Sequence, residues 1–134
     1  MEAKIGYVVI KIKMKTVPTF TATIYVGLKY TDNRTTDDFN LIYDHELLRS
    51  VCQKYCDETG FCVTYTETDY IYTKGKEPGA IVGIINYPRF PSDAKTLRER
   101  AITLAKLLQK ASNQYKVTIV MPNETVMIER EDLV

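Results

Sequence analysis

Polar and apolar residues alternate along the first segment of the chain, which is the pattern of a half-buried β-strand. The apolar positions of one side are Val8, Ile10, Ile12 and Met14. A turn around Val17-Pro18 follows, and residues 20–29 then alternate in the same way. We therefore expect a strand over residues 8–15, a second over residues 20–29, and pairing of the two as a hairpin.

The next segment predicts a helix. Residues 31–40 are rich in Asp, Asn and Thr, which is typical of a polar loop. Asp44 can then cap a helix through its carboxylate, and Gly60 supplies a stop. Apolar residues recur at helical spacing between them: Leu47, Leu48, Val51, Cys52, Tyr55 and Cys56.

Two strands are predicted after this helix. Residues 61–73 begin with clear alternation, but the phase slips between Glu67 and Tyr70, which predicts a bulge or a strand end there. A turn at residues 74–79 leads into residues 80–87, which are almost wholly apolar. Such a run indicates a strand buried on both faces, and hence a central place in the sheet.

A long amphipathic helix is predicted over residues 94–111, and short strands over residues 115–121 and 125–129 complete the chain. The order is ββαββαββ, and its inner part reads βαββαβ, the order of a ferredoxin-like unit. We predict a single α+β domain over residues 1–134. It would be a two-layer sandwich with two helices on one face of a mainly antiparallel sheet.

The segment NYPRFPSDAKTLRERA, residues 86–101, joins the apolar strand to the long helix and is stiffened twice. Pro88 and Pro91 each fix their own backbone and keep the preceding residue extended. Ser92 is then free to be the N-cap of the helix. The junction is therefore predicted to have a defined shape.

This junction can form an anion site. The guanidinium of Arg89 can lie near the free amides of the helix start, and the side chains of Asn86 and Tyr87 can add hydrogen bonds. A purely structural alternative is that Phe90 fills the gap between helix and sheet and that Arg89 pairs with Asp93. The sequence leaves both open.

Composition narrows the classes of partner. The 134 residues include 18 basic and 17 acidic side chains, a net charge of +1, so no overall field attracts nucleic acid or a membrane surface. No segment approaches the roughly 18 uninterrupted apolar residues of a membrane span. We expect neither a membrane nor a nucleic acid as partner.

The three cysteines are an odd number, which does not suit a secreted disulfide scaffold. This favours a reducing cytoplasm, or the host cytoplasm for a protein made by a phage. Cys52 and Cys56 fall on the apolar stripe, where a reduced cysteine acts as a small hydrophobe, and their spacing matches no common zinc site. We expect no metal and no cofactor, and we expect His45, at the helix start, to be solvated.

Ten tyrosines and no tryptophan are present. Strand propensity explains most of these tyrosines, but Tyr70 or Tyr72 could instead stack on a ligand ring. Lys11 and Lys13 follow one side of the first strand. They either contact phosphates or keep an edge strand from pairing with other chains.

No nucleophile-and-base pair is apparent, so the residues favour a non-enzymatic binding protein over an enzyme. We expect an oligomer that sequesters or senses a small phosphate-bearing or nucleotide-like ligand, held by Arg89, Asn86, Tyr87 and the amides near Ser92. One alternative is a self-assembly or protein-interaction module that docks through a sheet edge or face. Another is an enzyme that uses His45 or Arg89 on a phosphate ester.

Overall fold

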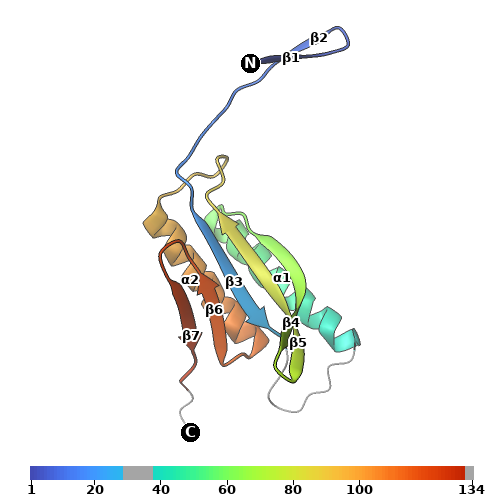
Figure 1. The fold of residues 1–134 in the computed structure, drawn as a ribbon, viewed down its shortest axis with the longest axis vertical. Helices are drawn as coiled ribbons and strands as arrows, with labels where there is room; N and C mark the ends of the chain where they lie inside the picture. Colours follow the sequence, from blue (N-terminus) through green and yellow to red (C-terminus); the bar gives the residue numbers. More distant parts are fainter. Residues whose placement is uncertain (29–37, 132–134) are drawn as a thin grey trace.

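A computed structural model describes residues 1–28 and 38–131 of the chain. Seven strands and two helices occur in this part (Figure 1). In order they are β1 (Glu2–Ile5), β2 (Val8–Lys11), β3 (Thr21–Gly27), α1 (Asp38–Thr59), β4 (Thr64–Tyr72), β5 (Gly75–Ile85), α2 (Ala94–Ser112), β6 (Lys116–Val120) and β7 (Thr125–Glu129).

The larger sheet has the strand order β4-β5-β3-β6-β7, and every neighbouring pair is antiparallel. The segment from β3 through α1, β4, β5 and α2 to β6 places its first and third strands side by side in the centre. That is the arrangement of a ferredoxin-like βαββαβ unit, to which β7 adds an edge. The predicted fold class is confirmed.

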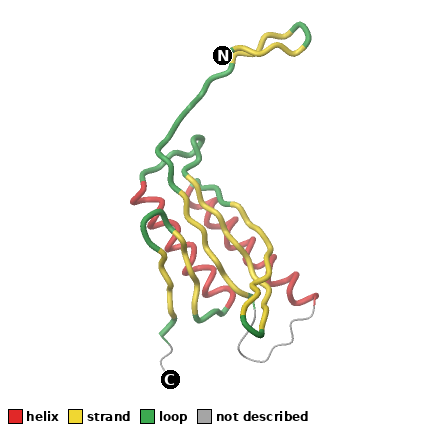
Figure 2. Tube along the Cα trace, viewed as in Figure 1, coloured by secondary structure: helices red, strands yellow, loops and turns green. Residues whose placement is uncertain are grey.

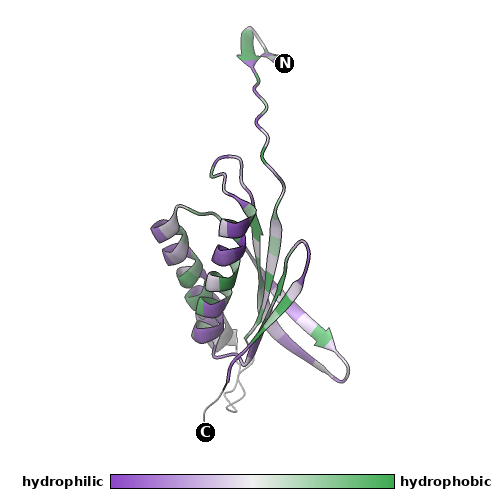
Figure 3. Cartoon of the chain, turned by 90° about the vertical axis from the view of Figure 1, so that its left-hand side faces the viewer, coloured by the Kyte–Doolittle hydropathy of each residue, from purple (hydrophilic) through white to green (hydrophobic). Residues whose placement is uncertain are grey.

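Both helices cover the same face of this sheet, and the other face is open (Figure 3). The core lies between the two layers, where alternate residues of the strands meet the apolar stripe of α2. Its largest fully buried side chains include Ile24, Leu48, Ile84, Leu104 and Ile119. Burying each of these contributes roughly 1.5–3 kcal/mol.

Asp93, not Ser92, is the N-cap of α2. Its carboxylate accepts a hydrogen bond from the Thr96 amide at 2.7 Å, and this bond lowers the pKa of Asp93. The cap therefore lies one residue later than predicted. Asn113 ends the helix in the left-handed conformation, with its amide bonded to the last-turn carbonyls.

The predicted pairing of the first strand with β3 is wrong. β1 pairs with β2 through a tight turn at Gly6, whose φ is +60°, and this hairpin lies far from the rest of the molecule (Figures 1 and 2). β3 already has β5 and β6 on its two sides, so no edge remains for an N-terminal strand. Residues 12–20 form an extended connection.

The helix α1 begins at Asp38, six residues before the predicted cap at Asp44. The rest of the predicted polar loop, residues 31–37, lies outside the described residues. The predicted bulge in β4 is absent, because the register with β5 is continuous from Thr64↔Gly83 to Tyr72↔Gly75. Among the described residues, no helix is long and apolar enough to cross a membrane.

β5 is an inner strand, as predicted, but it is covered on one face alone. Ala80, Val82 and Ile84 are buried under the helices, whereas Ile85 on the open face is 41% exposed. Three glycines of β5, Gly75, Gly79 and Gly83, lie beneath side chains of β4. At Gly79, a Cβ would come within 2.5 Å of the Val26 carbonyl and would overlap the Tyr70 ring.

Candidate functional site

The predicted anion-binding junction is built around Asn86, which is buried. Its side-chain amide donates to the carbonyl of Pro18 at 2.8 Å, and its Oδ1 accepts from the Ser92 amide at 3.0 Å. Its backbone amide donates to the carbonyl of Phe20 at 3.1 Å. Asn86 and Ser92 therefore hold each other, and Asn86 also fixes the segment that enters β3.

The other side chains of this junction do not converge on a common point: Arg89 and Phe90 are exposed, and Tyr87 is half-buried. Arg89 is exposed, with its guanidinium 5.5 Å from the ring centre of Phe90. Burial and a hydrogen bond with the Cys62 thiol raise the pKa of Tyr87. Phe90 is 42% exposed, so it does not fill the gap between helix and sheet. An anion at Arg89 stays a prediction.

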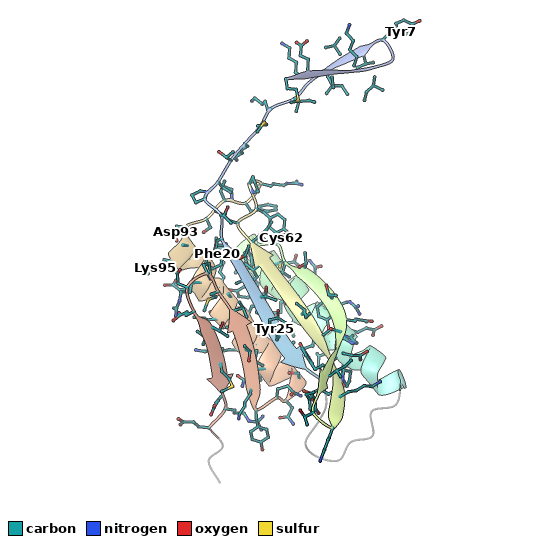
Figure 4. All side chains as sticks on the ribbon, viewed as in Figure 1. Tyr7, Phe20, Tyr25, Cys62, Asp93 and Lys95 are labelled. Atoms are coloured by element: carbon teal, nitrogen blue, oxygen red, sulfur yellow. The ribbon has the colours of Figure 1, made fainter. Side chains whose placement is uncertain are left out.

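The remaining predicted ligand residues lie elsewhere. Lys11 ends β2 and Lys13 follows it, in the N-terminal segment whose tip carries Tyr7 (Figure 4). Tyr70 lies on the open face, where its hydroxyl donates to the carbonyls of Ala80 and Val26 at 2.7 and 3.3 Å. Tyr72, at the end of β4, is half exposed and covers Gly75. The structure does not gather these residues with Arg89 into one site.

A different group of polar side chains meets where α1 crosses β4. His45 and Arg49 lie one turn apart on α1, and Tyr65 and Glu67 lie two residues apart on β4. Nδ1 of His45 is 2.7 Å from the Tyr65 hydroxyl, and Arg49 donates to Glu67 at 2.9 Å. The Arg49 guanidinium carbon also lies 4.7 Å from the centre of the Tyr65 ring. We call these four residues the α1–β4 cluster.

Burial and charge tune the groups of this cluster. His45 is 4% exposed, so the expectation of a solvated histidine is wrong. Burial lowers the pKa of His45 and raises the pKa of Tyr65, which keeps both groups neutral near pH 7. The hydrogen bond from Arg49 lowers the pKa of Glu67, so this carboxylate is ionised. The cluster thus combines a neutral imidazole–phenol pair with an ion pair.

We expect the stability of the fold to fall as the pH drops below about 6.5, where the unfolded chain begins to protonate His45 before the folded chain does. Glu67 and Asp44 partly oppose this shift and Arg49 supports it, but burial is the largest cause. The unfolding free energy measured in urea at about pH 7.5 and about pH 5.5 should therefore decrease more for the native chain than for His45→Gln. Equal decreases would contradict the assignment of His45 as buried and neutral.

A groove of about 470 Å³ adjoins the cluster. Arg49 and Tyr65 form one end, and Phe90 from the proline junction lines it as well. Its other lining residues are Cys52, Gln53, Cys56, Phe61, Cys62 and Val63. We call this the α1–β4 groove; its size lies in the usual range for small-molecule sites.

The cysteines contribute apolar wall to this groove. Cys52 is 5% exposed, and burial raises the pKa of its thiol to about 12, so the thiol is protonated near neutral pH.

Within residues 1–28 and 38–131, no three His, Cys, Asp or Glu side chains lie close enough together to form a metal site.

No family model matches this sequence, and no curated protein matches it. Two solved structures share the fold. One, a phage SAM lyase in the apo state, has a TM-score of 0.61 and 18% identity, over 86% of this chain and 92% of that chain. The other, a phage SAM lyase in complex with S-methyl-5'-thioadenosine, has a TM-score of 0.59 and 16% identity, over 90% of this chain and 96% of that chain.

Both are phage SAM lyases.

At this level of identity the likeness shows a shared fold. The expectation of a non-enzymatic binding protein is corrected by these comparisons, because the fold neighbours are enzymes that act on S-adenosylmethionine. A nucleotide-like small ligand agrees with the bound methylthioadenosine of one neighbour. Methylthioadenosine carries no phosphate, however, so the comparisons give no support to a phosphate-bearing ligand.

The α1–β4 cluster was missed in the sequence, although its signals are present there. His45 and Arg49 have the i, i+4 spacing of neighbours on one helix face. Tyr65 and Glu67 have the i, i+2 spacing of one strand face. Glu67, an acidic residue on the same strand face as Tyr65, breaks the alternation of polar and apolar residues, and this accounts for the phase slip in the sequence.

Proposed function

We propose that this protein is an enzyme that cleaves S-adenosylmethionine (SAM) and releases methylthioadenosine, with the substrate bound in the α1–β4 groove. The fold likeness over most of both chains supports this proposal. Fold alone does not establish function, so the local chemistry has to fit the substrate as well. The proposed setting is the cytoplasm, that of the host cell for a phage protein.

The observation that carries the proposal is that Tyr65 and Glu67 already hold a cation. Arg49 lies over the Tyr65 ring at 4.7 Å and 2.9 Å from a carboxylate oxygen of Glu67. An aromatic face together with a carboxylate attracts a sulfonium in the same way as it attracts a guanidinium. Arg49 is about half exposed and can move away when SAM enters.

The rest of the groove suits the remainder of the substrate. Phe90 is exposed at its rim and offers a face on which adenine can stack. Once displaced, Arg49 is free to bind the carboxylate of the amino-acid chain through its fork of N–H donors. A volume of about 470 Å³ holds a nucleoside with a short side chain.

Methylthioadenosine forms when the bond between the sulfonium and the amino-acid chain breaks and its electrons pass to sulfur. In one route the carboxylate of SAM attacks the carbon next to sulfur, and a five-membered lactone is the second product. In the other, a base removes a proton from the neighbouring carbon, and an unsaturated amino acid is the second product. Neither route requires a nucleophile from the protein.

The first route suits this groove better. Its two opposite charges, sulfonium and carboxylate, cancel as the new bond forms, so apolar surroundings that exclude water favour the reaction. Cys52, Phe61 and Val63 give the groove an apolar wall against which this reaction can take place. His45 is buried and bonded to Tyr65, so its role is to fix the orientation of that ring rather than to take a proton from substrate.

The proposal is tested by incubating the purified full chain with SAM and following the products by mass spectrometry. We expect methylthioadenosine to accumulate with an equal amount of lactone, which identifies the route. Two controls are run in parallel: the chain without SAM, and SAM without the chain. The second measures the background, because SAM also decomposes slowly on its own. Accumulation no faster than that background would overturn the proposal.

A further inference from the structure

A second groove, of about 450 Å³, lies between the two helices. Helices α1 and α2 run side by side on one face of the sheet, and every residue that lines this groove belongs to one of them (Figure 1). It shares no lining residue with the α1–β4 groove, and its size is also that of a small-molecule site. We call it the interhelical groove.

The wall of the interhelical groove is apolar. Val51 and Tyr55 line it from α1, and Leu107 and Ala111 line it from α2. Tyr55 is buried, so its ring closes the groove toward the core, where it packs edge-on against Phe61 with 6.4 Å between ring centres. The side chains of Val51 and Ala111 are short, so they leave the space above Tyr55 open.

Leu107 has apolar surface that the fold does not cover. It is 41% exposed, whereas the other three leucines of α2 are at most 1% exposed. A ligand with an apolar part would remove this surface from water, which favours binding.

The charged residues of the groove favour an anion. Lys54 from α1 and Lys110 from α2 line it together with one acid, Glu58. Glu58 lies 4.0 Å from Lys54, and both side chains are largely exposed, so this pair is weak. Among the described residues, no salt bridge involves Lys110. The groove therefore has a net charge of +1, with Lys110 as the unbalanced cation.

We propose that the interhelical groove binds an amphipathic carboxylate, that is, an unbranched acyl chain of about ten carbons with one carboxylate group. The carboxylate pairs with the ammonium group of Lys110, and the chain lies along Val51, Tyr55 and Leu107. A small polar anion would leave this apolar wall uncovered, and a neutral hydrocarbon would leave the charge of Lys110 unmatched. The site is independent of the proposed SAM cleavage, because the two grooves share no residue.

Calorimetric titration of the full chain with decanoate tests this proposal, with decanoate kept below the concentration at which it forms micelles. We expect a dissociation constant of about 0.1 mM at low salt. Octanoate should bind roughly 5- to 15-fold more weakly, because two fewer methylene groups are buried. Decyltrimethylammonium, which has the opposite charge on a chain of the same length, should bind at least about fivefold more weakly than decanoate.

Two substitutions show whether decanoate binds in this groove. Ala111→Phe fills the space above Tyr55 and should weaken binding at least about tenfold. Lys110→Gln removes the unbalanced charge and should weaken binding roughly 3- to 10-fold. Lys106→Gln is the matched control, because Lys106 is also exposed, one turn earlier on α2, and does not line the groove. This control should change binding less than about twofold. The unfolding temperature of each variant shows that the fold is kept.

Three results would overturn the proposal. The first is no binding of decanoate by the native chain at about 1 mM. The second is binding that survives Ala111→Phe, which would place decanoate on another surface, such as the exposed apolar residues of the N-terminal hairpin. The third is an equal loss for Lys110→Gln and Lys106→Gln. If the native chain ignores decanoate but Ala111→Phe abolishes self-association in ultracentrifugation, the groove belongs to a second copy instead.

Discussion

Glu67→Gln is expected to raise the KM for SAM roughly 10- to 100-fold and to leave kcat within about threefold of the native value. The carboxylate attracts the sulfonium of bound SAM, and this positive charge disappears as the carbon–sulfur bond breaks. In the transition state the bond is only partly broken and much of the positive charge remains, so the carboxylate stabilises the bound substrate and the transition state to a similar degree; its loss therefore raises KM and changes kcat little. Initial rates of methylthioadenosine release over a range of SAM concentrations measure both constants.

The ion pair of Arg98 and Glu124 provides a matched control. It joins α2 to the turn before β7 at 2.6 Å, and its side chains are 48% and 50% exposed, close to the 48% and 56% of Arg49 and Glu67. Glu124→Gln should leave both kinetic constants unchanged. An equal KM for native chain and Glu67→Gln would contradict the assignment of Glu67 to the substrate cation.

Leu104→Ala is expected to lower the unfolding free energy by roughly 3–5 kcal/mol, the largest stability effect among these predictions. Leu104 lies at the centre of the buried face of α2 and has no exposed surface. Its truncation removes apolar burial and leaves a cavity between helix and sheet. Urea unfolding followed by circular dichroism measures the difference.

Leu107→Ala on the same helix is the comparison for this effect. Leu107 is 41% exposed, so the same chemical change should cost less than about 1 kcal/mol. Similar losses for the two variants would show that the sheet-facing side of α2 is not the core. The comparison is independent of any ligand.

The two-layer core was predictable because each of its elements has a clear period. α2 keeps its apolar residues at helical spacing from Leu97 to Leu108, and β6 alternates from Val117 to Ile119. The order of these elements then restricts the topology to few arrangements, and the ferredoxin-like unit is one of them.

The N-terminal segment shows where pattern reasoning fails. Alternation from Val8 correctly indicated a strand, but the period of a strand does not say which strand it pairs with. The short strand β1 was not predicted, because two of its four residues, Glu2 and Lys4, are charged. The turn at Gly6 was not predicted either. Pairing with β3 is excluded by β5 and β6 on its two sides, a consequence of topology that no local pattern contains.

The α1–β4 cluster shows the corresponding limit for the site. Its four residues come from two elements, and the burial of His45 depends on the depth at which α1 packs on β4. The sequence placed His45 at a helix start, whereas α1 begins seven residues earlier, at Asp38. A site formed by side chains of two packed elements can be recognised only once the contact between those elements is known.

A crystal structure of the protein with methylthioadenosine would test the central claim most directly. We predict adenine against Phe90 in the α1–β4 groove, with the sulfur beside the Tyr65 ring and the Glu67 carboxylate. Methylthioadenosine bound at another place, with this groove empty, would contradict the assignment of the groove as the SAM site.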